Sequence, residues 1–124
     1  MEFKIDTKPN YTVITPESGN LSVNLAEGIR QKVEDATETD SHNFVVDLRN
    51  VIEMDMAAGN VLLDLHHFMY NNGCSLVFTT LEDSVMQTMK KGQYHLSLNL
   101  TPTLNEAIDI ISMEVLERDL LGES

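Results

Sequence analysis

Basic residues are scarce in this sequence, which has 8 Lys and Arg against 20 Asp and Glu and a formal net charge of −12. Proteins that bind nucleic acid or anionic membrane surfaces use clusters of Lys and Arg to attract phosphate groups. A chain with this charge balance has few residues from which to build such clusters. The composition therefore argues against a nucleic-acid partner and against binding to a membrane surface.

Cysteine is almost absent, and long apolar runs are missing. Cys74 is the single cysteine, so no disulfide forms within the chain, which favours a reducing compartment. No apolar stretch approaches the roughly 18 residues that indicate a membrane-spanning helix. The first ten residues, MEFKIDTKPN, lack the pattern of a signal peptide. We expect a cytoplasmic protein with no membrane insertion.

The apolar content is sufficient for one folded core. Hydrophobic residues make up 42% of the 124 residues, and a chain of this length buries about two-thirds of its unfolded surface on folding. No internal repeat or linker divides the sequence. We predict a single domain that spans residues 1–124.

The spacing of the apolar residues predicts strands that alternate with helices. Phe44–Leu48 is apolar on both faces and is expected at the centre of a sheet. The order β-β-α-β-α-β-α-β-α predicts an α/β fold with a mostly parallel central sheet of four to five strands, packed by about four helices. We expect strands at residues 3–7, 11–15, 44–48, 76–78 and 95–100, and helices around residues 25–36, 58–71, 85–91 and 104–115.

The second helix has a clear amphipathic pattern. Asn72-Gly73 follows it, as is common where a helix ends on a residue in the left-handed conformation. One face of this helix is expected to pack on the sheet. The apolar residues on that face are Ala58, Val61, Leu62, Leu65, Phe68 and Met69.

Two helices begin with residues that favour N-terminal caps. The first has two alternatives, a capping box of Asn24 and Glu27 or a single cap at Ser22. The last has a capping box of Thr103 and Glu106.

No set of residues indicates catalysis, a metal or a cofactor. Cys74 lies at the start of a buried strand with no basic neighbour in sequence, which favours an inert thiol. His66 and His67 are adjacent, so on a helix their side chains diverge and share a zinc ion poorly. The glycines are too isolated to form a phosphate-binding loop. We therefore predict a protein that is not an enzyme and carries no metal or cofactor.

The loop between the central strand and the second helix carries two acidic residues, Glu53 and Asp55. Asp55 is positioned to cap the helix by accepting hydrogen bonds from its first N–H groups. A helix start can also bind anions, but these carboxylates would repel a phosphate. We favour the capping role for Asp55 over an anion site.

The segment 44–64, FVVDLRNVIEMDMAAGNVLLD, resembles the signature of the STAS domain of bacterial anti-sigma factor antagonists. That signature is an apolar strand ending in Asp-Leu, a short connector, and an Asp-Ser-(Ser/Thr)-Gly loop that opens an amphipathic helix. The match needs no gap. Further similarity covers Leu21-Ser22 before the first helix, Asn72-Gly73 before the next strand, and the start of the last helix at 103–107.

The sequence departs from the family where the family is regulated. In the family, the second hydroxyl residue of the loop is phosphorylated by a kinase that is also an anti-sigma factor. The matching position here is Ala57, with Met56 before it and Ala58 in place of glycine. Ala57 is therefore a degenerate phosphorylation site, because alanine has no hydroxyl that could accept a phosphate.

The resemblance implies a non-catalytic interaction module that binds an anti-sigma factor or a kinase-like regulator, without the usual phosphorylation switch. Met56 either contacts the partner or packs against the sheet, and both interpretations stay open. The expected partner-binding residues are Glu53, Met54, Asp55, Met56, Ala57, Ala58, Gly59 and Asn60.

Acidic residues are concentrated around this loop. Residues 33–64 contain eight acids and one base, Arg49. Such a run is often only a solvated face, but a partner with a basic contact surface would also fit it.

Two other functions stay open. Some STAS relatives are said to bind nucleotides or lipids, which makes a small-ligand site an alternative. The second is a homodimeric scaffold, because the last helix has more apolar residues than one face can pack on a sheet. The surplus residues are Ile110, Met113, Leu116, Leu120 and Leu121.

Overall fold

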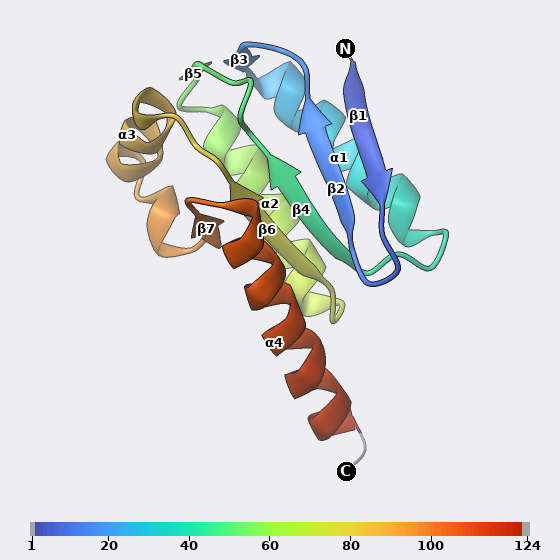
Figure 1. Cartoon of the computed structure of the whole chain (residues 1–124). Coiled ribbons are helices and arrows are strands. Elements are labelled where there is room, and N and C mark those ends of the chain that lie inside the picture. The colour runs from blue at the N-terminus through green and yellow to red at the C-terminus, as the bar shows by residue number, and fades with distance from the viewer. Residues whose placement is uncertain (1, 123–124) are drawn as a thin grey trace.

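A central strand, β4 (Asn43–Asp47), organises the computed structural model, which describes residues 2–122 (Figure 1). The five-stranded sheet has the order β1-β2-β4-β6-β7. β1 (Phe3–Thr7) pairs antiparallel with β2 (Thr12–Pro16). The other pairs, which include β6 (Ser75–Thr79) and β7 (Leu100–Thr101), are parallel. Residues 1, 123 and 124 of the predicted domain lie outside the described residues.

A second sheet is formed by two short strands, β3 (Asn20–Leu21) and β5 (Glu53–Met54), which pair in parallel.

No helix among the described residues is long and apolar enough to cross a membrane. The helices are α1 (Val23–Thr37), α2 (Ala58–Asn71), α3 (Asp83–Lys91), the 3-10 turn η1 (Tyr94–Leu96) and α4 (Leu104–Gly122).

The central strands are buried on both faces. Phe44 and Val46 of β4 contribute to the larger core, which also contains buried side chains of α1, α2 and α3. Val45 points the other way, into a smaller core with Ala107 and Ile111 of α4. Successive side chains of a strand point to opposite faces, so the apolar run in β4 requires helices on both sides of the sheet.

The predicted fold class is confirmed, with four α-helices and a mostly parallel five-stranded sheet. The strands expected at residues 3–7 and 11–15 form an antiparallel hairpin joined by a turn at residues 8–10. Ser22 is the cap of α1, and its Oγ accepts a hydrogen bond from the Leu25 N–H at 3.1 Å. Thr103 caps α4 in the same way, accepting from the Glu106 N–H at 3.2 Å.

The strand predicted at residues 95–100 is wrong for most of its length. Only Leu100 continues into β7, and the preceding residues form η1 and a turn. Gln93 adopts a left-handed backbone with φ 60°, and the Leu98 N–H bonds to the Tyr94 carbonyl at 2.9 Å. The alternation of leucines is misleading because Leu96 is 72% exposed.

The predicted apolar stripe of α2 is correct except at one residue. Ala58, Leu62, Leu65 and Met69 are buried on the sheet, but Phe68 is 45% exposed. A large aromatic residue on a helix surface is thus easily assigned to a core from periodicity alone.

The Tyr70 hydroxyl connects α2, β6, α4 and the segment before β7. It donates to the Glu114 carboxylate at 2.7 Å and accepts from the Asn99 side chain at 2.6 Å. It also lies 3.3 Å from the Leu76 N–H and 3.4 Å from the Leu76 carbonyl. Burial, reinforced by the Glu114 carboxylate, raises the pKa of Tyr70. The hydroxyl therefore provides a hydrogen-bonding partner for the backbone of Leu76 on the edge of β6. The short strand β7 pairs with β6 only at Phe78 and Thr79 and does not reach Leu76.

A second polar contact fixes α4 to the sheet. Arg118 donates to the Ser75 hydroxyl of β6 at 2.8 Å and to the Asn43 side-chain oxygen of β4 at 2.6 Å. Arg118 thus ties α4 to the starts of the two central strands, and Glu114 ties it to Tyr70 of α2.

We expect Tyr70→Phe to lower the free energy of unfolding by about 2–3 kcal/mol, because it removes a hydrogen bond to a carboxylate and leaves buried polar groups without their partner. Urea denaturation followed by circular dichroism measures the change. Tyr11→Phe is the matched control: among the described residues no hydrogen bond reaches the Tyr11 hydroxyl, so a change within about 0.5 kcal/mol is expected. Equal effects of the two substitutions would contradict the role assigned to Tyr70.

Candidate functional site

The loop between β4 and α2 lies at the carboxyl end of the parallel strands, where α/β proteins place their functional loops. Its backbone is held by the segment before α1. The Ile52 N–H donates to the Gly19 carbonyl at 2.8 Å, and the Asp55 N–H donates to the Leu21 carbonyl at 3.0 Å. These bonds form the β3–β5 pair and fix the path of the loop.

The eight predicted partner-binding residues differ in their exposure. Ala58 and Gly59 are buried at the start of α2, and Met54 is partly buried. A partner could therefore reach five of the eight side chains freely. The exposed ones are Glu53, Asp55, Met56, Ala57 and Asn60.

The predicted capping role of Asp55 is wrong. The N-cap residue of α2 is Ala57, and no side chain caps this helix. The Ala58 N–H instead bonds to the Asp55 backbone carbonyl at 3.0 Å, and the Asn60 N–H bonds to the Ala57 carbonyl at 3.2 Å. A tight turn of backbone bonds thus satisfies N–H groups that a cap would otherwise serve, and the exposed Asp55 carboxylate contributes charge to the surface.

The side chain of Tyr94 packs against the start of α2. Its hydroxyl lies 3.1 Å from the Met56 carbonyl and 3.0 Å from Asn60 Oδ1, so its single proton is shared between these two acceptors. The Tyr94 ring packs on Gly59, where an added Cβ would lie 2.1 Å from the ring, and on Gly92, where the distance would be 2.3 Å. The sequence pattern does not reveal this contact, although glycines near two helix ends are a signal of close packing.

α3 supports the loop from the other side. The Ser84 hydroxyl donates to the Ile52 carbonyl at 2.6 Å. The Ile52 side chain itself is 65% exposed, and Met56 is 43% exposed. The Met56 sulfur lies close to Gly92, where an added Cβ would be 2.8 Å away. Met56 therefore both packs against the end of α3 and presents part of its side chain to the solvent.

The loop surface combines apolar and acidic groups. Ile52 and Met56 provide exposed apolar area, and Glu53 and Asp55 provide exposed carboxylates. Arg49 is the base nearest in sequence, but it is engaged with Asp47, with nitrogen–oxygen distances of 2.6 and 2.9 Å. The Asp47 hydrogen bond is the largest cause of a raised Arg49 pKa.

Ala57 is exposed at the first turn of α2. A side chain at this position is accessible to a kinase, but alanine offers no oxygen for phosphoryl transfer. The loop therefore presents an exposed surface with a methyl group at position 57.

The thiol of Cys74 does not form part of this loop. It is buried, 3.9 Å from His42 Nδ1, and burial raises the pKa of the Cys74 thiol against the opposing effect of Arg118. A buried thiol with a raised pKa stays protonated at neutral pH, as the predicted inert role requires.

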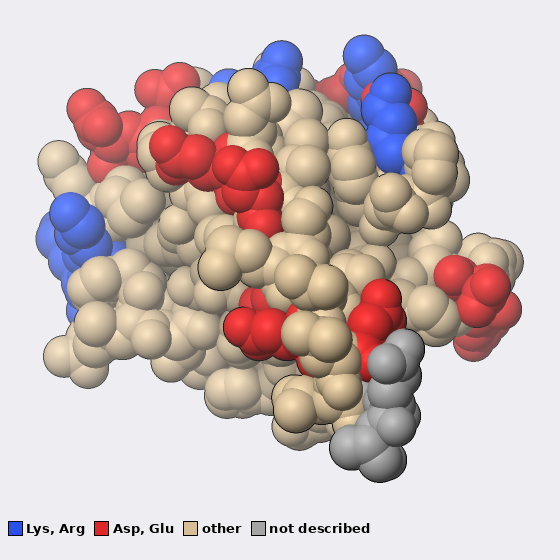
Figure 2. All heavy atoms as spheres, turned by 60° about the horizontal axis from the view of Figure 1, so that its bottom comes forward, with Lys and Arg blue, Asp and Glu red and all other residues tan. Residues whose placement is uncertain are grey.

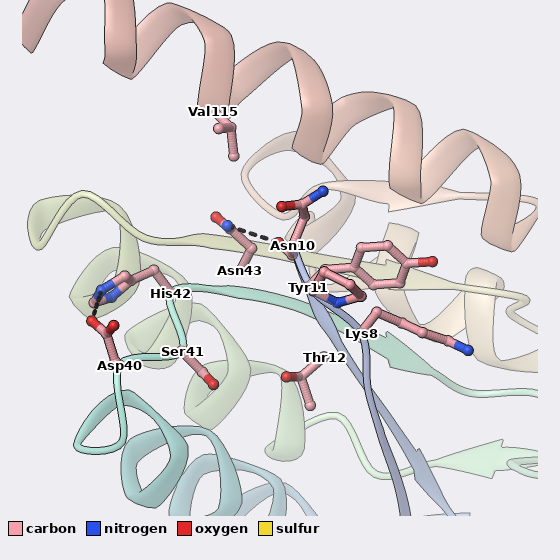
Figure 3. A pocket seen from close by; sticks show the side chains of 10 residues that line it. Lys8, Asn10, Tyr11, Thr12, Asp40, Ser41, His42, Asn43 and Val115 are labelled. Carbon is pink, nitrogen blue, oxygen red and sulfur yellow. Dashed lines mark hydrogen bonds and ion pairs between the residues drawn. The ribbon is translucent and has the colours of Figure 1, made fainter.

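A polar cavity of about 210 Å³ lies at the opposite end of the sheet, beside Lys8, Tyr11 and His42 (Figure 3). His42 pairs with Asp40 at 3.1 Å, and Asn43 donates to the Asn10 carbonyl at 3.0 Å. The cavity is separate from the loop before α2. Nothing in it distinguishes a nucleotide or lipid site, so small-ligand binding stays a prediction.

The model of the STAS domain family matches residues 2–107. No curated protein sequence matches. Similar solved structures include an anti-sigma factor antagonist from Mycobacterium paratuberculosis, with 14% identity, a TM-score of 0.75, and coverage of 90% of this chain and 93% of that one.

Two further structures share the fold. One is the anti-sigma factor antagonist SpoIIAA in its unphosphorylated form, with 16% identity, a TM-score of 0.70, and coverage of 90% of this chain and 96% of that one. The other is a chain of the stressosome, a signal integration and transduction hub, with 16% identity, a TM-score of 0.67, and coverage of 88% and 96%.

We expect Gly59→Ala to lower the free energy of unfolding by about 2 kcal/mol, because the new methyl group would overlap the Tyr94 ring. In a Tyr94→Leu background the same substitution is expected to cost clearly less, since the ring is gone. Gly19→Ala is the control: its Cβ would meet only Ile52 at 3.7 Å. Equal costs of Gly59→Ala in both backgrounds, measured by urea denaturation, would contradict the Tyr94 contact.

Proposed function

The chain belongs to the STAS domain family, and from this premise we propose that it is a non-catalytic interaction module that binds an anti-sigma factor or a kinase-type regulator. The contact surface is the loop 53–60 with Ile52. The observation that carries the proposal is the exposed Ala57 at the family's phosphorylation position, on a loop whose backbone is held from three sides. We propose the cytoplasm as its compartment, because Cys74 is a free thiol.

The mixed character of the loop supports a protein partner. Exposed apolar side chains beside charged ones are typical of a transient protein interface. Methionine adapts its shape to a partner surface, which suits the exposed part of Met56. SpoIIAA and the protein from Mycobacterium paratuberculosis, which share the fold, are both described as anti-sigma factor antagonists.

The missing hydroxyl determines how the interaction is regulated. A phosphoryl group at this position would add about −1.5 to −2 charges, beside the exposed carboxylates of Glu53 and Asp55. Alanine resembles an unphosphorylated serine in size and charge. The protein therefore binds its partner as a permanently unphosphorylated antagonist would.

The charge of the loop favours a basic partner surface. Glu53 and Asp55 are exposed, and Arg49 is held by Asp47. The negative charge is not confined to the loop: Figure 2, which turns the bottom of Figure 1 toward the viewer and the top with β5 away, also shows acidic side chains spread over that face, with basic side chains at its margins. Opposite charges across an interface accelerate association and have less effect on the final affinity.

The test partner is a kinase of the GHKL type that binds this protein, and we expect it to leave the wild type unmodified in the presence of ATP. The same kinase is expected to phosphorylate Ala57→Ser, because this substitution restores the acceptor at an exposed helix start. Intact mass spectrometry measures the phosphate in both proteins. A variant with serine at a buried position, Ala58→Ser, is the control and is expected to stay unmodified.

A stoichiometric phosphate on residues 53–60 of the wild type would contradict the proposal. Isothermal titration calorimetry gives a second test, because Met56 lies within the proposed contact. If the kinase binds the wild type tightly and binds Met56→Asp with the same affinity, the proposal is also contradicted.

We expect the association rate with the kinase to fall as salt rises from 50 to 300 mM, roughly as the Debye length shortens. Surface plasmon resonance measures the rate. Glu53→Lys/Asp55→Lys should reduce both the rate at low salt and its salt dependence, because it removes the attracting charges. Lys90→Glu/Lys91→Glu, which makes α3 more acidic, is the comparison and should not slow association. A rate independent of salt would exclude a basic contact surface.

A further inference from the structure

The outer edge of β1 has hydrogen-bonding groups that nothing in the described chain uses. β1 ends the sheet order, and Figure 1 shows no strand beyond it. The Lys8 N–H bonds to the Tyr11 carbonyl and the Glu17 N–H bonds to the Glu2 carbonyl. Hydrogen-bonded pairs alternate along an antiparallel ladder, so the even-numbered residues bond inward. The backbone groups of Phe3, Ile5 and Thr7 therefore point outward.

We propose that this edge is a self-association surface, on which β1 of a second copy of this chain pairs antiparallel about Ile5. In that register, the outward-facing backbone groups of Ile5 meet those of the second copy's Ile5. Those of Phe3 meet those of the second copy's Thr7. All outward groups of the strand are then satisfied, and two five-stranded sheets become one continuous sheet.

The side chains are complementary in the same register. Lys4 of each copy lies opposite Asp6 of the other, at the non-hydrogen-bonded positions where cross-strand side chains come closest. Within one copy, Asp6 pairs with Lys8 at 3.3 Å, and both side chains are about half exposed. Among the described residues Lys4 has no ion pair. The second copy's Asp6 supplies one.

Ile5 gives the pairing an apolar centre. Its side chain is 49% exposed, which is unusual for isoleucine in a protein that buries most of its aliphatic residues. It lies on the same face of β1 as Phe3, whose ring is partly buried in the larger core. Antiparallel pairing would bring the two Ile5 side chains together on that face and remove both from water.

The edge of β1 suits a second copy better than the exposed apolar side of α4 does. Met113, Leu116 and Leu120 are each more than half exposed, as the predicted homodimer through this helix requires. However, α4 has five acids and one base, and the base, Arg118, is held by β4 and β6. Two such helices would repel each other. On β1 the charges alternate in sign, which limits repulsion between two copies that each carry a net charge of −12.

Sedimentation velocity of the full chain, over micromolar to hundreds of micromolar concentrations, is expected to show a monomer that converts to a dimer. Lys4→Asp and Asp6→Lys should each weaken the dimer about tenfold or more, because each places like charges opposite one another twice. Both residues are exposed, so the thermal midpoint of each variant confirms that it still folds.

The double exchange Lys4→Asp/Asp6→Lys should restore the dimer. A mixture of Lys4→Asp with Asp6→Lys should form a heterodimer, because the carboxylates of one variant then face the ammonium groups of the other. Leu116→Glu/Leu120→Glu is the comparison for α4 and should leave the dimer intact.

A chain that stays monomeric at hundreds of micromolar would overturn the proposal. If the α4 variant is monomeric while both β1 single variants are still dimeric, self-association occurs through α4. That result would also overturn the proposal. Failure of the mixture to form heterodimers would exclude the register about Ile5.

Discussion

β4 has large apolar side chains on both of its faces, and this constraint determines the rest of the architecture. Phe44 and Val46 need cover on one side and Val45 on the other. Parallel strands connected by helices provide that cover, with α1, α2 and α3 on one face and α4 on the other. The same connections bring the loop after β4 to the carboxyl edge of the sheet, where it meets the turn before α1 and the start of α3.

The shape of this loop does not depend on the side chain at position 57. Its shape comes from backbone bonds to Gly19 and Leu21, from Ser84 and from the Tyr94 ring, and Ala57 contributes no side-chain bond to it. Under the proposed function, alanine at position 57 therefore removes the phosphorylation switch and leaves the contact surface in place. The acids on the loop are exposed, so under the same proposal they act on a basic partner by long-range attraction.

The sequence predicted the parts of the structure that depend on local pattern. The alternation in residues 3–7, the apolar run of β4 and the spacing of buried residues in α1 and α2 all correspond to observed elements. Ser22 and Thr103 were identifiable as caps because their hydroxyls act within three residues. The loop was found through its resemblance to a family signature.

The errors arose where a distant contact decides the local structure. Residues 95–100 alternate like a strand, but most of them form η1 and a turn, next to the Tyr94 ring that packs on Gly59 of α2. Asp55 has the chemistry of a cap, yet a turn of backbone bonds takes its place. On β1, every second residue hydrogen-bonds to β2 and the others face outward. The alternation of apolar and polar residues does not show which set is which. Such features become visible only when elements far apart in sequence are placed together.

The most direct test of the central claim is hydrogen–deuterium exchange of this protein bound to its kinase, with and without ATP. A contact at the loop that is independent of phosphorylation predicts protection of residues 52–60, with the same extent of protection in both conditions. Protection confined to other segments, or its loss on adding ATP, would contradict a permanently unphosphorylated binding surface at the start of α2.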